Sequence, residues 1–136
     1  MKTGLFYSFS SGKTQYVAER IAKEFGGNIY DYRDIVARYV NKRPDYYKAF
    51  RGTMLSWDNT ARRGANSNVF HYANPEEYSK WLTGIIDYTT NYNDKEYQYI
   101  FINAWNEWAE GTHLEPDEEY GTQYLQVTKD SLHSNY

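Results

Sequence analysis

The 136-residue chain contains no cysteine, which excludes a disulfide framework and any metal site with thiolate ligands. No apolar run approaches the ~20 residues that a membrane-spanning helix needs, so we expect no contact with a membrane. Basic residues are not in excess, because 15 Lys and Arg stand against 18 Asp and Glu, a formal net charge of −3. Nucleic acid is therefore not an expected partner. The three histidines, His71, His113 and His133, lack the spacing of a metal site, and we predict no bound metal.

Aromatic residues are abundant, at 19% of the chain, and 16 of them are tyrosines. Disordered chains are poor in aromatic residues because they cannot bury enough apolar area to offset chain entropy. We therefore predict a single folded domain over residues 1–136. A complete (β/α)₈ barrel is excluded, because it requires ~250 residues. Residues 1–4 lead into a strand-like stretch and not into a signal peptide, so we expect a cytoplasmic protein.

Strand and helix patterns alternate along the chain. Four segments predict strands, the last of them buried on both faces: residues 3–9, 28–32, 52–57 and 97–105. Three segments predict helices: residues 13–25, 74–91 and 121–132. Residues 33–47 suggest a helical turn or two, and residues 58–68 a long polar loop. The clearest helix starts with Pro75, because Asn74 can cap it and apolar residues then recur on one face.

The alternation predicts an α/β fold with a mainly parallel sheet. In such sheets ligands bind beyond the carboxyl ends of the strands. Three polar clusters follow expected strands, at residues 8–14, 57–63 and 106–110. We therefore expect all three clusters to line one shared crevice.

The first cluster, Ser10-Ser11-Gly12-Lys13-Thr14, lies between an expected strand and an expected helix. Backbone N–H groups and the helix dipole favour an anion there. Tyr7 stands where a Walker A motif requires glycine, so a triphosphatase is not predicted. Residues 1–27 resemble the amino terminus of flavodoxins, although Ser8 and Phe9 depart from that pattern. The resemblance implies FMN or phosphate binding at Ser10, Ser11, Gly12, Lys13 and Thr14. The alternative is that these residues only form a good βα turn.

The third cluster belongs to the run FINAWNEWAEGTHLEPD, residues 101–117. Together with further matches between residues 30 and 132, this run resembles the carboxyl-terminal part of WbsX-type proteins of polysaccharide biosynthesis, relatives of glycoside hydrolase family 99 with a (β/α)₈ barrel. Ala61 departs from the family, which usually has proline there. The resemblance implies that Glu107 is the base acting on the sugar 2-hydroxyl and that Glu110 is the general acid/base, as in retaining endo-mannosidases.

The residue types in these clusters suit carbohydrate chemistry. Two neighbouring carboxylates can take different pKa values and act as acid and base. Glu107 and Glu110 share a face only if the chain turns helically after the strand, because residues three apart in an extended chain point oppositely. The alternatives to these roles are that Glu110 is simply an exposed carboxylate and that Asn106 only caps a loop. Tryptophan side chains can stack on sugar rings. The substrate-binding candidates are Trp57, Asp58, Asn59, Trp105, Asn106 and Trp108.

The two resemblances meet near residues 27–30, which indicates a fusion, engineered de novo or shuffled. A flavodoxin-like βα unit (residues 1–27) would precede barrel-derived βα units (residues 28–136). The expected product is a three-layer, flavodoxin-like open parallel sheet of about four strands, in the order 2-1-3-4, with helices on both faces.

For function, we predict a fragment or chimera of a carbohydrate-active protein that retains the sugar-site carboxylates, with little or no turnover and no cofactor. A barrel site takes residues from several strands, and most of those strands are absent from this chain. The alternative is a module that binds FMN or phosphate, with Trp57 stacking on the flavin ring. The expected ligand is a carbohydrate or a phosphate, and open sheet edges would allow a homodimer.

Overall fold

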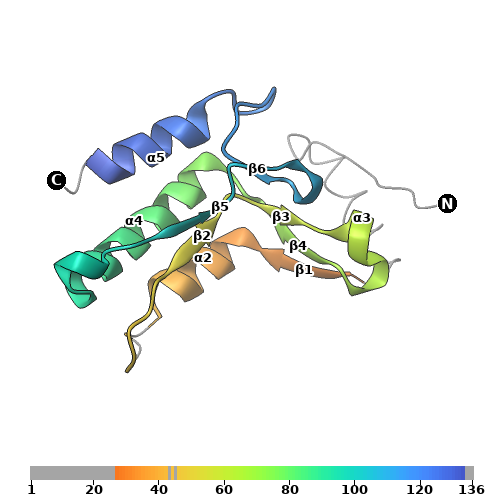
Figure 1. The fold of residues 1–136 in the computed structure, drawn as a ribbon. Coiled ribbons are helices and arrows are strands. Elements are labelled where there is room, and N and C mark those ends of the chain that lie inside the picture. The colour runs from red at the N-terminus through yellow and green to blue at the C-terminus, as the bar shows by residue number, and fades with distance from the viewer. Residues whose placement is uncertain (1–26, 43, 45, 134–136) are drawn as a thin grey trace.

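A computed structural model describes residues 27–42, 44 and 46–133 (Figure 1). The strand expected at residues 3–9, the helix expected at 13–25 and the loop from Ser10 to Thr14 lie outside the described residues. The described elements are, in chain order, β1 (Asn28–Asp31), α2 (Tyr32–Val40), β2 (Gly52–Met54), β3 (Trp57–Asp58), α3 (Thr60–Arg63), η1 (Gly64–Asn66), β4 (Asn68–His71), α4 (Pro75–Tyr92), η2 (Lys95–Tyr97), β5 (Phe101–Asn103), β6 (Asn106–Glu107), η3 (Trp108–Glu110), β7 (Thr112–His113) and α5 (Gln123–His133), where η marks a 3₁₀ helix.

The described strands form three small sheets. β1 pairs in parallel with β4, and β4 pairs antiparallel with β3. β2 pairs in parallel with β5, and β6 pairs antiparallel with β7 as a hairpin. The described residues thus have a mixed α/β fold. The third and fourth expected strands, which correspond to β2 and β5, do lie side by side. The flavodoxin-like order 2-1-3-4 is not confirmed, because β1 pairs with β4, a strand that the sequence patterns did not predict.

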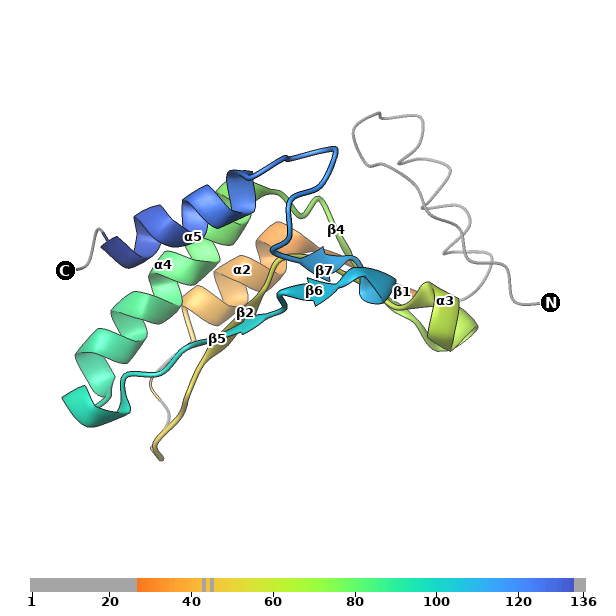
Figure 2. The ribbon, with the colours of Figure 1, turned by 45° about the horizontal axis from the view of Figure 1, so that its top comes forward.

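Three helices lie side by side, with α4 in the middle. α4 contacts α2 on one side and α5 on the other, and it also contacts β2. In the second ribbon view the three helices lie on the same side of the β2–β5 pair (Figure 2). Within the described part of the chain, helices on the second face of this pair are not found.

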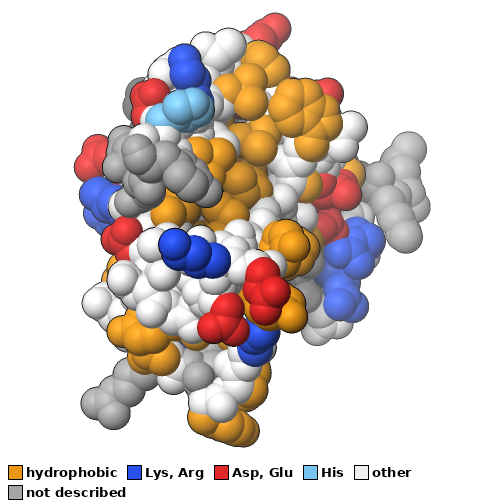
Figure 3. All heavy atoms as spheres, turned by 60° about the vertical axis from the view of Figure 1, so that its left-hand side comes forward, with side chains coloured by type: hydrophobic (Ala, Val, Ile, Leu, Met, Phe, Trp, Pro, Cys, Tyr) orange, Lys and Arg blue, Asp and Glu red, His pale blue; other side chains and the backbone are white. Residues whose placement is uncertain are grey.

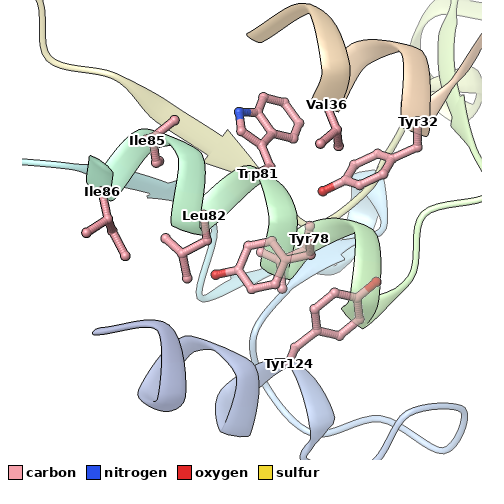
Figure 4. Packing of buried hydrophobic residues seen from close by; sticks show 9 residues of the cluster. Tyr32, Val36, Tyr78, Trp81, Leu82, Ile85, Ile86 and Tyr124 are labelled. Atoms are coloured by element: carbon pink, nitrogen blue, oxygen red, sulfur yellow. The ribbon is translucent and has the colours of Figure 1, made fainter. Parts of the chain in front are cut away.

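The prediction of α4 is confirmed, and local signals explain it. Asn74 caps the helix by accepting a hydrogen bond from the Glu77 backbone N–H at 3.0 Å, and Pro75 occupies the first turn. The predicted apolar face is buried and forms the centre of the core (Figure 4). The buried residues of this core are Tyr32, Val36, Leu55, Tyr78, Trp81, Leu82, Ile85, Ile86 and Tyr124.

Tyrosines fill much of this core while keeping their hydroxyl groups bonded. The Tyr32 hydroxyl donates to the Met54 carbonyl, and the Tyr78 hydroxyl lies 3.0 Å from Thr128 Oγ1. Burial raises the pKa of Tyr78 to about 12 and raises the pKa of Tyr32 and Tyr124 further still. These side chains therefore stay neutral in the folded protein well above pH 10.

Two strand predictions need correction. The segment 97–105 forms only the short strand β5, and its expected burial on both faces is wrong: Tyr99 is 57% and Phe101 60% exposed. Within the described residues β5 pairs only with β2, and the three residues of β5 are exposed or half-buried. The segment 52–57 also divides into two strands that belong to different sheets. The expected polar loop 58–68 contains the short helices α3 and η1.

Candidate functional site

Two of the three predicted polar clusters lie next to each other. The helix α3, which follows β3, contacts η3, which joins β6 to β7. Figure 2 shows the hairpin β6–β7 running toward α3. The first cluster, residues 8–14, lies outside the described residues.

An ion pair joins these two segments. Glu110, the last residue of η3, is only 9% exposed. Its Oε1 accepts hydrogen bonds from Nε of Arg62, at 2.8 Å, and from Nη2 of the same guanidinium. The Arg62 side chain is itself 61% exposed, so the buried carboxylate meets a cation that reaches solvent. The alternative of an exposed Glu110 is therefore wrong.

Glu107 lies at the start of the turn that ends with Glu110. It is exposed, pairs with Thr112 across the hairpin, and immediately precedes η3. In a 3₁₀ turn residues three apart lie above one another, so the chain does turn helically after the strand, as a shared face requires. The two carboxylates nevertheless have different surroundings, since one faces solvent and the other is buried against Arg62.

Trp108 is held in place from two directions. Its ring stacks on the ring of His113, with centroids 3.6 Å apart and an interplanar angle of 15°. Its indole N–H donates to Oε2 of Glu115. The side chain remains 47% exposed, and Trp105 is 54% exposed. Two tryptophan side chains at or next to the hairpin are thus partly open to solvent.

The sequence patterns did not identify His113 and Glu115 as supports of Trp108. Gly111 has φ 66° and forms the tight turn that folds His113 back onto the tryptophan. That glycine, placed between Trp108 and His113, was the signal that could have predicted a hairpin. His113 Nδ1 also lies 3.9 Å from Oδ2 of Asp117.

The hairpin is anchored to the end of β5. The buried Thr112 hydroxyl donates to the Asn103 carbonyl, and the Leu114 backbone N–H donates to the Trp105 carbonyl at 2.9 Å. The site therefore follows the carboxyl end of a strand of the parallel β2–β5 pair, as expected for α/β sheets.

The other substrate-binding candidates make mostly local contacts. Asn59 is buried, and its Oδ1 accepts from the Asn68 backbone N–H at 2.8 Å. Asp58 Oδ1 accepts from the Thr60 backbone N–H at 2.9 Å, at the start of α3. Trp57 is half-buried in β3, and Asn106 is exposed in β6. In this structure Asp58 and Asn59 shape the segment that carries Arg62.

The described part of the chain shows no candidate metal site. Residues 27–42, 44 and 46–133 contain no cluster of three His, Asp or Glu side chains that could hold a metal ion. The FMN or phosphate loop, Ser10 to Thr14, lies outside these ranges, so flavin binding stays a prediction. None of the described helices is both long and apolar enough to cross a membrane.

Comparison with known proteins identifies the family. The chain matches the family described as glycosyltransferase WbsX over residues 3–128. It is 36% identical over 110 residues to the "Uncharacterized protein WxcX" of Xanthomonas campestris pv. campestris, in strain B100 and in strain ATCC 33913. The aligned part is 80% of this chain but only 16% of each relative. No solved structure matches.

The family match has a consequence for the amino-terminal residues. It begins at residue 3 and therefore includes most of the stretch that resembles flavodoxins. A flavodoxin relationship and a fusion near residues 27–30 are not shown by these comparisons. The WbsX part of the prediction is confirmed: the chain belongs to the WbsX glycosyltransferase family.

Proposed function

We propose that the chain is part of a carbohydrate-active protein of polysaccharide biosynthesis and that it binds a sugar at the β6–β7 hairpin. The observation that carries this proposal is that one turn, η3 (Trp108–Glu110), holds both the buried Glu110, which is bonded to Arg62, and the 47% exposed Trp108. A carboxylate next to an open aromatic face can bond sugar hydroxyls while the apolar face of the sugar ring stacks. The family description and the WxcX relatives support a role with carbohydrates.

Within this proposal the two carboxylates have separate roles. Glu110 acts as general acid/base, and Glu107 acts as the base on the sugar 2-hydroxyl. Their different surroundings support such a division, because Glu107 is exposed whereas Glu110 is buried against Arg62. Trp105 and Trp108 supply the stacking surfaces.

We further propose that the chain retains little or no turnover. It spans about a sixth of the length of its WxcX relatives. A glycosidase site on a barrel draws residues from several strands, and correct placement of the substrate contributes much of the rate. We therefore expect what remains of the site to bind a sugar without catalysing a reaction on it.

Sugar binding is tested by saturation-transfer NMR with methyl α-mannoside and short α-mannose oligosaccharides. We expect transfer to the sugar in the original protein and its loss in Trp108→Ala. The matched control is Tyr92→Ala, which removes a ring that is 61% exposed at the end of α4, away from the hairpin. Transfer that survives in Trp108→Ala, or that is absent in the original protein, would contradict the site.

Turnover is tested with an activated aryl α-mannoside. We expect release of the aryl alcohol at the rate of buffer alone. A measurable rate that disappears in both Glu107→Gln and Glu110→Gln would overturn the proposal of an inactive fragment while supporting the sugar site itself.

A homodimer that pairs two copies along an open edge stays a proposal. β5 carries the exposed side chain of Phe101, and within the described residues it has a strand neighbour on one side only. Light scattering across a concentration series tests this proposal, and a mass of one chain at every concentration would exclude it.

A further inference from the structure

Trp108 differs from other exposed aromatic side chains in how its ring is held. Figure 3, which brings the left-hand side of Figure 1 forward, shows hydrophobic side chains exposed among charged ones, so exposure alone does not mark a binding site. The exposed rings of Tyr46 and Tyr47, for example, meet edge to face at 90°. The Trp108 ring instead lies nearly parallel to the ring of His113, at an interplanar angle of 15°. This stack defines the plane in which the indole lies.

The contacts of Trp108 leave only one of its faces for stacking. The imidazole of His113 covers the other face, with the ring centroids 3.6 Å apart. The indole N–H, on the edge of the ring, donates to Oε2 of Glu115. Trp108 is nevertheless 47% exposed. The face available to a ligand is therefore the one that points away from His113.

His113 is fixed in turn by the segment that follows it. Its Nδ1 lies 3.3 Å from the carbonyl oxygen of Glu115, and because a carbonyl oxygen can only accept, Nδ1 is the donor. Nδ1 also lies 3.9 Å from Oδ2 of Asp117. Oδ1 of Asp117 accepts from the backbone N–H groups of Glu119, at 2.9 Å, and Tyr120, at 2.6 Å. The imidazole is thus held by a turn that is itself hydrogen-bonded.

These contacts fix Trp108 before a ligand arrives. A side chain that has to be immobilised on binding weakens the affinity by about two- to twelvefold, because its rotational freedom is lost on association. In Trp108 that freedom is already lost in the free protein, through the His113 stack and the bond to Glu115. An indole held in this way can present its open face to a pyranose ring with little further loss of side-chain entropy.

From this geometry we infer that His113 and Glu115 are positioning residues of the sugar site, and that the sugar stacks on the face of Trp108 opposite His113. These roles rest on the function proposed above, to which they add what prepares the site for binding. His113 acts through the ring stack, and Glu115 acts through the indole N–H. Both residues therefore raise the affinity for the sugar through Trp108.

The affinity is measured by NMR titration of the full chain with methyl α-mannoside. We expect His113→Ala and Glu115→Ala each to raise the Kd about three- to tenfold, because Trp108 is then free to rotate. His113→Phe keeps a flat ring for the stack, and Glu115→Gln keeps an oxygen that accepts from the indole N–H. These two conservative variants should return the Kd to within about twofold of the original, although each removes the ionisable group.

Two controls change the same residue types away from the stack. His133→Ala alters the last residue of α5, where Nδ1 bonds the carbonyl of Lys129 at 2.8 Å. Glu118→Ala removes a carboxylate from an exposed position close to Glu115 in the sequence. Both controls should leave the Kd unchanged, and circular dichroism checks that every variant is folded.

The face that the sugar occupies is measured by intermolecular nuclear Overhauser effects. We expect contacts between the sugar ring protons and the indole of Trp108, and none with the imidazole of His113, because the indole lies between them. If the original protein binds no sugar, the proposed function fails and the positioning roles fail with it. If it binds sugar, the positioning roles alone are overturned by alanine variants that bind equally well, by conservative variants that do not restore the Kd, or by contacts between the sugar and His113.

Discussion

Arg62 and Arg63 are adjacent in the sequence but have different surroundings in the fold. Arg62 donates two hydrogen bonds to the buried Glu110, whereas Arg63 is exposed. A carboxylate with little access to water needs a partner, because its desolvation is not otherwise compensated. The same residue type therefore has a structural role at one position and a solvated one at the next.

We expect Arg62→Ala to destabilise the protein by about 1 kcal/mol, since it leaves Glu110 buried without its cation. Loss of a fully buried partner can cost about 3–5 kcal/mol, but the Arg62 side chain is 61% exposed and solvent screens the pair. Urea unfolding followed by circular dichroism measures the change. The matched control Arg63→Ala should stay within about 0.5 kcal/mol of the original. Equal effects of the two variants would show that the ion pair contributes nothing.

At the scale of elements, α2 and α4 can approach each other closely because Gly84 of α4 has no side chain. A Cβ placed on Gly84 of α4 would lie 2.7 Å from Cγ2 and 2.9 Å from Cγ1 of Val40, at the end of α2. Both distances are shorter than a normal carbon contact. Gly84 thus allows the two helices to pack closely, although glycine is a poor helix former.

Gly84→Ala should therefore lower the free energy of unfolding by about 1 kcal/mol. The helix gains about 1 kcal/mol from alanine, but overpacking of this kind costs about 1–3 kcal/mol. Thermal and urea unfolding measure the net effect. In a Val40→Ala background the overlap with both methyl groups is gone, so the same Gly84→Ala change should become neutral or stabilising. A stabilising effect in both backgrounds would show that the helices separate freely.

How far the sequence predicts these elements depends on whether the signal is local. α4 was predictable because its cap, its proline and its apolar period all lie within eighteen residues. β4, Asn68–His71, was missed because only its pairing with β1 and β3, which lie elsewhere in the sequence, makes it a strand. The contact of Arg62 with Glu110 spans 48 positions, and no local pattern encodes it.

At the scale of the whole molecule, the core depends on neutral tyrosines from three helices. Tyr32 of α2, Tyr78 of α4 and Tyr124 of α5 are all buried in one cluster. Tyr78 and Tyr124 contact each other edge to face, with centroids 5.4 Å apart. Half-buried Tyr120 adjoins them, and burial together with the nearby Glu119 carboxylate raises its pKa to about 12. The three helices are thus joined through groups that must remain protonated.

The protein should consequently unfold in alkali. The pKa of each of these tyrosines is higher in the folded chain than the value of about 10 expected when unfolded, so their stabilisation is complete below pH 10 and is lost as the pH rises toward 12 and beyond. For Tyr78 alone, we expect the free energy of unfolding to fall by about 2 kcal/mol by pH 12. Circular dichroism and absorbance at 295 nm, recorded together, should show helix loss and tyrosine ionisation in one transition.

Two phenylalanine variants make this prediction specific. Tyr78→Phe removes one titrating group and its bond to Thr128, so it should be less stable at pH 7 but lose less stability between pH 10 and 12. Tyr92→Phe, at a position 61% exposed, should leave the pH dependence as it is in the original protein. An unchanged alkaline slope in Tyr78→Phe would mean that this ring reaches water in the folded state. In that case the close packing of α4 against α5 around Tyr78 would not persist in solution.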